Sequence, residues 1–213
     1  MSRKGVVLLG AGGHAKVIVD ILRDSGLYDV IGCLAASSTG KEVAGVKVIG
    51  DDSDLPRLYA EGLKDAFIAI GDNARRAEMM QFVTKMGFKL INAISPYSHI
   101  SPSVHLGQGI AVMPGVVINV DTVIGDNAII NTGATIDHDC VIGAHCHIGP
   151  GTNIAGNVKI GSGSFLGIGC RVIPKINIGE WTVIGAGAVV VNDIPSSITA
   201  IGVPAKIKEE QGK

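Results

Sequence analysis

Residues 131–151, "NTGATIDHDCVIGAHCHIGPG", place three histidines, two aspartates and two cysteines in one short stretch of the chain. Side chains of these types can bind a metal ion, move protons as general acids and bases, or act as nucleophiles. The direction in which each side chain points decides among these chemistries. The scaffold that carries the stretch is therefore the first thing to establish.

A six-residue repeat governs the chain from Val104 onward, beginning VHLGQG, IAVMPG, VVINVD, TVIGDN. The third position is aliphatic in all 15 units and predicts one inward side chain per unit. Those residues are Leu106, Val112, Ile118, Ile124, Ile130, Ile136, Ile142, Ile148, Ile154, Ile160, Leu166, Val172, Ile178, Ile184 and Val190. The fourth position is mostly Gly, Asn or Asp, which we expect to adopt the backbone angles of a corner. Three units close a triangular coil, so the repeat predicts five coils stacked about 4.8 Å apart.

In the unit ATIDHD the isoleucine takes the inward position, so Asp137, His138 and Asp139 fall at a corner. Residues three units apart stack, which places His138 between Val120 and Gly156. The absent side chain at Gly156 leaves room for the imidazole and a bare N–H beside it. An imidazole next to a carboxylate and a free N–H suits acyl transfer, with a base, a group that fixes its tautomer, and an oxyanion donor.

A metal site is the alternative interpretation of the same stretch. His138, His145 and His147 occupy the fifth, sixth and second positions of their units and diverge within one coil. A trimer interface could still bring two of them together, as in β-helical carbonic anhydrases, but zinc requires converging ligands, so no metal is expected. A nucleophilic Cys140 or Cys146 is less favoured, because both stand at the first position, where a small apolar residue packs.

Residues 1–97 follow a different pattern and carry 23 of the 37 charged side chains (18 basic and 19 acidic). The segments GVVLLG, VIGCLA and DAFIAIG read as strands, and AKVIVDILRDSG and ARRAEMMQFVTKMG read as helices. Alternation of strands and helices predicts an α/β domain with a small parallel sheet. We therefore expect three parts: this domain at 1–97, the β-helix at 98–195, and a cap or tail at 196–213, beginning within IPSSITAIGVPAK.

A glycine-rich loop, GAGGHAK, follows the first predicted strand and opens the first predicted helix. Free backbone N–H groups converge on an anion at such a loop, so it predicts a phosphate site, with a structural tight turn as the alternative. NAD is disfavoured, because CLAASST after the second strand lacks the acidic residue of a dinucleotide site. The segment AIGDNARR ends another strand and would face the same crevice, with Gly71 and Asn73 nearest.

The composition excludes several partners. A net charge of -1 with 17% charged residues gives no reason to expect nucleic acid or an anionic membrane surface. No apolar run reaches about 18 residues, and Gly and His interrupt the first apolar stretch, which argues against a signal peptide. Four cysteines without a CxxC pair read as reduced packing thiols. The expectation is a cytoplasmic protein.

The combination of GAGGHAK, AIGDN, NTGATIDHDC and AIGVPAK resembles the hexapeptide-repeat sugar acyltransferases, which include the sialic-acid O-acetyltransferases. It resembles still more the N-acetyltransferases of nucleotide-linked 4-amino-4,6-dideoxysugars, of the perosamine and bacillosamine type. The resemblance implies a left-handed parallel β-helix and a homotrimer with active sites at subunit interfaces. It further implies a nucleotide-linked amino sugar on the N-terminal domain and acetyl-CoA, the co-substrate, between neighbouring β-helices.

The resemblance also implies roles for individual residues. His138 would be the general base and Asp139 its carboxylate, in a direct transfer without metal or acyl-enzyme. The substrate-binding residues would be Gly12, Gly13, His14, Gly71, Asn73 and Asn131. The acetyl-CoA-binding residues would be His147, Gly156, Ile168, Ala186, Pro204 and Lys206. Where the family carries base-reading acids after the second strand, this chain has Ala35, Ala36 and Ser37, so the nucleotide stays open. The alternatives are an O-acetyltransferase acting on a free sugar acid, a carbonic-anhydrase-like metal enzyme, and a scaffold without turnover.

Overall fold

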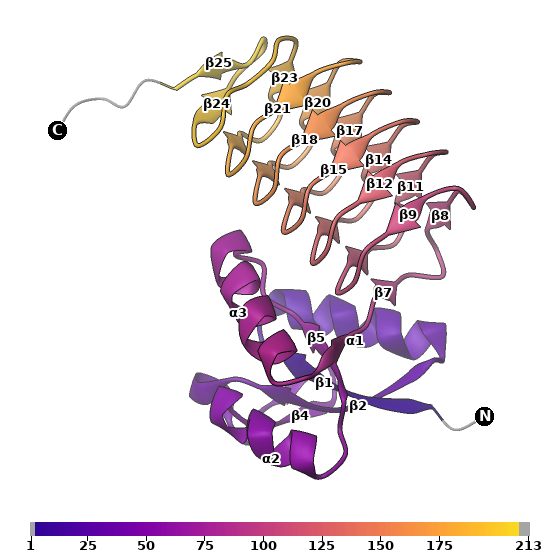
Figure 1. The fold of residues 1–213 in the computed structure, drawn as a ribbon, viewed down its shortest axis with the longest axis vertical. Coiled ribbons are helices and arrows are strands. Elements are labelled where there is room, and N and C mark those ends of the chain that lie inside the picture. Colours follow the sequence, from indigo (N-terminus) through magenta and orange to yellow (C-terminus); the bar gives the residue numbers. More distant parts are fainter. Residues whose placement is uncertain (1–2, 209–213) are drawn as a thin grey trace, which may run out of the picture. The chain divides into compact units, whose positions relative to one another are not determined.

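The computed structural model of the chain describes residues 3–208. It comprises two compact units, Met1–Pro96 and Tyr97–Lys213 (Figure 1). The two units differ in architecture.

The N-terminal unit is built on a six-stranded sheet with the order β3-β4-β2-β1-β5-β6 (Figure 1). Its strands are β1 (Lys4–Leu9), β2 (Tyr28–Leu34), β3 (Glu42–Val43), β4 (Val46–Gly50), β5 (Asp65–Ile68) and β6 (Lys89–Leu90), followed by β7 (Ala93–Ile94). Its helices are α1 (Gly13–Ser25), α2 (Leu55–Ala60) and α3 (Asn73–Lys85), with 3-10 turns η1 (Ala36–Ser38) and η2 (Asp52–Asp54). All pairings are parallel except that of β3 with β4.

The parallel sheet and the elements β1, α1, β2, β5 and α3 confirm the sequence-based prediction. Strand β4 and helix α2 were not predicted, since each is short and packs through tertiary contacts. Leu58 of α2 belongs to a core cluster with Leu9, Leu34, Ile68 and Val83 from the sheet and α3. The core therefore ties α2 to a sheet whose strands β1 and β5 are buried over residues 6–9 and 66–68.

The C-terminal unit is a triangular parallel β-helix with three faces (Figure 1). The β13 face contains β10 (Ala111–Val112), β13 (Ile129–Ile130), β16 (His147–Ile148), β19 (Phe165–Leu166), β22 (Val183–Ile184), β24 (Thr199–Ile201) and β25 (Lys206–Ile207). The β14 face contains β8 (His99–Ile100), β11 (Val117–Ile118), β14 (Thr135–Ile136), β17 (Asn153–Ile154), β20 (Arg171–Val172) and β23 (Val189–Val190). The β15 face contains β9 (His105–Leu106), β12 (Val123–Ile124), β15 (Val141–Ile142), β18 (Lys159–Ile160) and β21 (Asn177–Ile178).

Successive coils pair in a register of three repeat units, as the repeat predicts. Ile118 pairs with Ile136, and Ile136 pairs with Ile154 in the next coil. All the predicted inward residues are buried except Leu106 in the first coil, which is half-buried. At the end of the β-helix the tail forms an antiparallel pair, β24 with β25, which extends the β13 face. The last part of the predicted cap, residues 209–213, lies outside the described residues.

The expectation that the fourth position of each unit supplies the corner angle is wrong. Positive φ values recur at the sixth position, for example at Asn127 (60°), Gly133 (66°) and Asp139 (58°). The fourth position is small for another reason: a Cβ on Gly143 would lie 2.6 Å from the backbone nitrogen of Ser162 in the next coil. Close stacking of coils therefore selects the fourth residue, and left-handed backbone selects the sixth.

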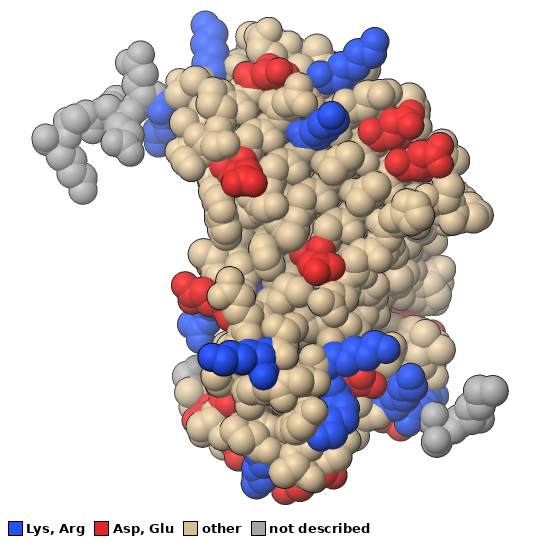
Figure 2. Space-filling model, viewed as in Figure 1, with Lys and Arg blue, Asp and Glu red and all other residues tan. Residues whose placement is uncertain are grey.

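All four cysteines are buried free thiols, which confirms their interpretation as packing residues. Broad parts of the β-helix surface carry no charge (tan in Figure 2). Among the helices within residues 3–208, none has the length and hydropathy needed to cross a membrane.

Candidate active site

The corner between β14 and β15 carries a histidine–carboxylate pair. His138 Nδ1 donates a hydrogen bond to Asp139 Oδ2 over 2.7 Å. This bond fixes the tautomer, because a neutral imidazole that donates through Nδ1 accepts through Nε2. The two side chains remain accessible, with exposed fractions of 48% and 53%. The pair is therefore available to a bound substrate.

Asp137 fixes the shape of this corner. Its Oδ1 accepts hydrogen bonds from the His138 backbone N–H and from Asn119 Nδ2 in the preceding coil, both at 2.9 Å. Its carbonyl oxygen accepts from Thr122 Oγ1 at 2.9 Å. Sequence reasoning placed Asp137 at the corner without giving it a role. The spacing of one full coil between Asn119 and Asp137 is the signal that could have revealed one.

The imidazole lies directly over Gly156 of the next coil. A Cβ at Gly156 would stand 2.6 Å from both Nε2 and Cε1 of His138. Within residues 3–208 the Gly156 N–H donates to no acceptor. The arrangement thus combines an accepting Nε2 with a free N–H donor, as the sequence predicts for a base beside an oxyanion site.

The local charges favour protonation of the imidazole. The hydrogen bond from His138 to Asp139 raises the pKa of the imidazole, and partial desolvation lowers it to a smaller extent. The negative charges of Asp137 and Asp139 raise this pKa further. Hydrogen bonds from Asn119 and from the His138 N–H hold the pKa of Asp137 below its usual value, so that carboxylate stays ionised. Chemically, the corner can accept a proton at Nε2 and stabilise the resulting imidazolium.

A second group of predicted residues lies at and beside the edge between the β13 and β14 faces. Asn131 Nδ2 lies 3.0 Å from His147 Nε2, and Asn131 Oδ1 accepts from the Thr132 N–H at 2.8 Å. The amide therefore donates to Nε2 of His147, whose ring meets Phe165 edge-on with centroids 5.2 Å apart. Ile168 is 62% exposed at the same edge.

Ala186 follows Ile168 by one full coil and is also exposed. Pro204 is exposed in the tail, and Lys206 lies on β25, at the end of the β13 face. The predicted β-helix residues thus form two groups on opposite sides of the β14 face. That face is hollowed into an open groove of about 610 Å³, lined by Thr135, Asp137 and Arg171 among others. One chain does not bring the two groups together.

The three histidines of the opening stretch also separate. His138 and His145 occupy two different edges, and His147 lies on the β13 face. His145 Nδ1 lies 3.0 Å from Asn127 Nδ2. In the part of the chain that the structure describes, no three His, Cys, Asp or Glu side chains cluster as a metal site needs.

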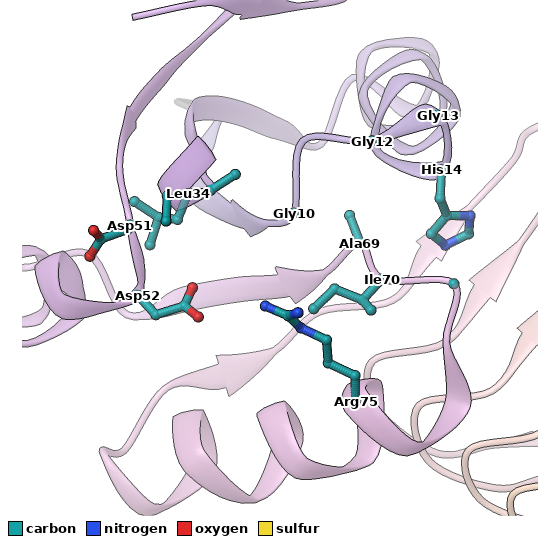
Figure 3. A pocket seen from close by; sticks show the side chains of 13 residues that line it. Gly10, Gly12, Gly13, His14, Leu34, Asp51, Asp52, Ala69, Ile70 and Arg75 are labelled. Atoms are coloured by element: carbon teal, nitrogen blue, oxygen red, sulfur yellow. The ribbon is translucent and has the colours of Figure 1, made fainter. Parts of the chain in front are cut away.

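The N-terminal unit contains a cavity of about 710 Å³ at the carboxyl ends of its strands (Figure 3). Gly12, Gly13 and His14 line it from the β1–α1 loop, and Gly71 lines it after β5. A Cβ at Gly12 or Gly13 would meet nothing within 4 Å, so the backbone there is open to a ligand. The glycine loop and the AIGDN segment face one cavity, as expected.

One predicted residue requires correction. Asn73 does not line this cavity, and its Oδ1 accepts a hydrogen bond from Arg76 Nη2 at 2.9 Å. Arg76 is buried and also donates to the carbonyl oxygens of Ile70 and Gly71. Asn73 therefore contributes to the shape of the loop after β5, because its side chain is turned towards the protein.

Sequence reasoning missed three charged residues of the cavity: Asp51, Asp52 and Arg75 (Figure 3). An acidic residue was expected only after the second strand, where Ala35 and Ala36 form part of the cavity wall. Strand β4 lies beside β2, so residues after β4 reach the same edge of the sheet. The signal was present in VKVIGDD, an apolar strand followed by two acids.

Two family models match the chain. Residues 5–83 match the PglD N-terminal domain, and residues 121–156 match the bacterial transferase hexapeptide, six repeats. The fold and the corner site therefore define a hexapeptide-repeat transferase with a PglD-type N-terminal domain.

Solved structures of similar chains narrow this class. A perosamine N-acetyltransferase from Caulobacter crescentus is 52% identical, with a TM-score of 0.95 over 98% of this chain and 99% of that chain. Its complex holds CoA and GDP-perosamine, in variants with one histidine replaced by asparagine or alanine. The acetyltransferase domain of PglB from Neisseria gonorrhoeae, in complex with acetyl coenzyme A, is 38% identical with a TM-score of 0.93, over 97% and 100% of the two chains.

A curated relative from Acanthamoeba polyphaga mimivirus, an uncharacterized protein, is 38% identical over 121 residues, and the match spans 57% of this chain and 24% of that protein. The full-length similarity to the two solved acetyltransferases decides the classification. The chain belongs to the family of hexapeptide-repeat sugar N-acetyltransferases of the perosamine and bacillosamine type. Its β-helix is accordingly the left-handed parallel kind, as the resemblance implied.

Proposed function

We propose that this protein transfers the acetyl group of acetyl-CoA to the 4-amino group of a nucleotide-linked 4-amino-4,6-dideoxysugar. The observation that carries this proposal is the His138–Asp139 pair, whose accepting Nε2 lies over Gly156 and its free N–H. The full-length similarity to a perosamine N-acetyltransferase solved with CoA and GDP-perosamine supports the choice of substrates.

The reaction is a direct transfer within a ternary complex. The sugar amine attacks the thioester carbonyl while His138 Nε2 takes the proton that the nitrogen loses. The Gly156 N–H donates to the oxyanion as the carbonyl carbon becomes tetrahedral. The C–S bond then breaks, and the imidazolium returns its proton to the CoA thiolate. Asp139 stabilises the imidazolium between these two proton transfers.

The remaining predicted residues hold the two substrates. Acetyl-CoA lies along His147, Ile168, Ala186, Pro204 and Lys206. The similarity to a PglB domain solved in complex with acetyl coenzyme A supports acetyl-CoA as the co-substrate. On the sugar side, Asn131 lies beside the acceptor and is oriented by Thr132. The nucleotide diphosphate rests on Gly12, Gly13 and His14, with Gly71 opposite.

The working unit in this proposal is a homotrimer with active sites between subunits. The base and the Asn131–His147 group lie on different sides of the β14 face, so neighbouring copies must supply them to one site. Large apolar side chains stand exposed on these sides of the β-helix, including Val120 (49%), Ile168 (62%) and Ile173 (40%). Burial of such residues between copies would stabilise the assembly.

Subunit complementation tests the interface. Trimers mixed equally from His138→Ala and Asn131→Ala chains contain a complete site wherever an intact His138 meets an intact Asn131. With random mixing about one half times one half, or about a quarter, of the sites are complete. Recovery of about a quarter of the wild-type rate is expected. Mixed trimers as inactive as their parents would contradict a shared site.

A thiol-release assay tests the reaction itself. The enzyme is incubated with acetyl-CoA and, separately, UDP-, GDP- and dTDP-linked 4-amino-4,6-dideoxysugars, with free sialic acid on the same plate. Turnover with a nucleotide-linked amino sugar is expected, and mass spectrometry should place the acetyl group on nitrogen. Turnover with the free acid alone would replace the proposal by O-acetylation, and no turnover with any acceptor would reject it.

A further inference from the structure

Three aspartates follow β4, and the carboxylates of two of them accept hydrogen bonds from neighbouring residues. Asp51 accepts hydrogen bonds from the N–H (2.8 Å) and hydroxyl (2.6 Å) of Ser53. Asp54 accepts from the Asp51 N–H at 3.1 Å and from Arg57. The Asp52 carboxylate accepts no hydrogen bond from any backbone or side-chain group that the structure describes, and it lines the cavity. Asp52 is therefore the carboxylate available to a ligand there.

The surroundings of Asp52 suit a flat, polar-edged ring. Arg75 extends from the first turn of α3 towards Asp52 across the cavity (Figure 3). Partial burial raises the pKa of the Asp52 carboxyl, and the charge of Arg75 lowers it to a smaller extent. Leu34, Ala35 and Ile70 supply apolar wall between these charges and the glycine loop. A planar heterocycle could rest on this wall with its edge at Asp52 and Arg75.

The sheet order places Asp52 as far from the phosphate loop as the base of a bound nucleotide, and farther than its ribose. The phosphate loop follows β1, and the order β4-β2-β1 puts β4 two strands away from it. Two strand spacings amount to about 10 Å. A ribose-binding carboxylate belongs after the second strand, one spacing from the phosphates, and that place holds Ala35 and Ala36. The group that reaches β4 is then the base attached to the ribose.

The hydrogen-bonding edges of the bases differ in a way that a carboxylate can distinguish. Guanine presents two adjacent donors, the N1–H and the N2 amino group, which match the two acceptor oxygens of a carboxylate. Uracil and thymine present one N–H between two carbonyl oxygens, which a carboxylate repels. Adenine presents one amino donor beside a ring acceptor. Arginine pairs with the O6 and N7 acceptors of guanine.

We propose that Asp52 reads the N1–H and N2 amino group of guanine while Arg75 contacts its O6 side, so that the chain selects a GDP-linked sugar. The inference rests on the proposed function, since it assigns the base specificity of the same nucleotide site. It places recognition of the base at the end of β4, in a chain that carries Ala35 and Ala36 after the second strand.

Calorimetric binding of GDP, IDP and UDP to the full chain, without acetyl-CoA, tests the assignment. IDP lacks the N2 amino group and should bind about 10-fold more weakly than GDP, and UDP about 100-fold more weakly. Asp52→Asn should weaken GDP binding about 10- to 100-fold and change the affinity for UDP by no more than about threefold. The affinities for GDP and IDP should then become similar. Equal weakening of all three nucleotides would assign Asp52 to the ribose or diphosphate and overturn the inference, as would unchanged binding.

Asp20→Asn is the matched control, because it removes the same charge from an exposed side chain of α1 outside the cavity. Its nucleotide affinities should equal those of the wild type. Acetyl-CoA binding by Asp52→Asn should also be unchanged, which shows that the variant folds. GDP-selective binding by a chain that transfers no acetyl group would reject the proposed function alone. Efficient transfer with equal affinity for GDP and UDP would reject the guanine assignment alone.

Discussion

The β-helix and the α/β unit place their functional residues by different means. In the β-helix, a side chain three repeat units further along the chain is a neighbour in space, as Asn119, Asp137 and Ala155 stack in successive coils of the β14 face. In the α/β unit, the cavity gathers Gly12, Asp52 and Arg75 from loops separated by whole strands and helices. Spacing alone thus locates the proposed base, whereas the proposed nucleotide pocket depends on sheet order.

The two regions also differ in what their residues should do in the reaction. In the proposed mechanism the corner of His138 carries proton transfer, so its substitution should lower kcat. The cavity of the α/β unit is the proposed site of nucleotide recognition, so substitution of its residues should raise KM. Substitutions in each of the two regions test this division of roles.

Replacement of the base should have the largest effect. His138→Ala should lower kcat by about 100- to 10,000-fold with KM for both substrates little changed, since general-base catalysis supplies about that factor. Steady-state thiol release measures both constants. His105→Ala, an exposed histidine on β9 of the β15 face, should behave as the wild type. Near-normal turnover by His138→Ala would remove this histidine from the mechanism.

Loss of the space beneath the imidazole should have the next largest effect. Gly156→Ala places a Cβ 2.6 Å from His138 Nε2 and must displace the ring, which should lower kcat by about 100-fold. The double variant gives the specific test. In the His138→Ala background the clash is absent, so Gly156→Ala should add little further loss. Fully additive losses in kcat would mean that Gly156 acts independently of the ring.

Removal of the carboxylate should give a smaller loss and a change in pH dependence. Asp139→Asn should lower the plateau of kcat by about 10- to 100-fold, because the imidazole loses the acceptor that fixes its tautomer. The base works when neutral, so kcat falls as pH drops through the pKa of His138, which Asp139 holds above its usual value. Without that carboxylate the pKa falls, and the acidic limb should move to lower pH. A limb that moves upward or stays in place would contradict the role of Asp139.

The smallest effect on turnover is expected in the α/β unit. Arg76→Met removes the donors that hold the carbonyl groups of Ile70 and Gly71 beside the cavity. KM for the nucleotide sugar should rise about 3- to 10-fold with kcat nearly constant, and the free energy of unfolding should fall by about 1 to 3 kcal/mol. Arg57→Met, which breaks only exposed ion pairs on α2, is the control. A fall in kcat with KM unchanged would contradict the division of roles between the two regions.

Periodicity explains how much of the site the sequence could predict. The inward isoleucines, the corner at His138, the stacking on Gly156 and the four packing cysteines follow from a repeat of six. A repeat makes tertiary neighbours a function of sequence distance, so no long-range pairing had to be inferred. In the α/β unit, only the long elements and the glycine loop carried signals strong enough to be recognised.

The tertiary structure decided the rest. The short strand β4 and helix α2 owe their form to a shared core, and only the pairing of β4 beside β2 brings Asp52 to the cavity of the α/β unit. Backbone geometry decided that the sixth residue of each repeat turns the corner, while the fourth is small because the next coil lies against it. By itself the sequence determined the scaffold and the corner that carries His138, because both depend on a local period. The position of the proposed base-reading carboxylate depends on which strands pair, and that is settled by packing.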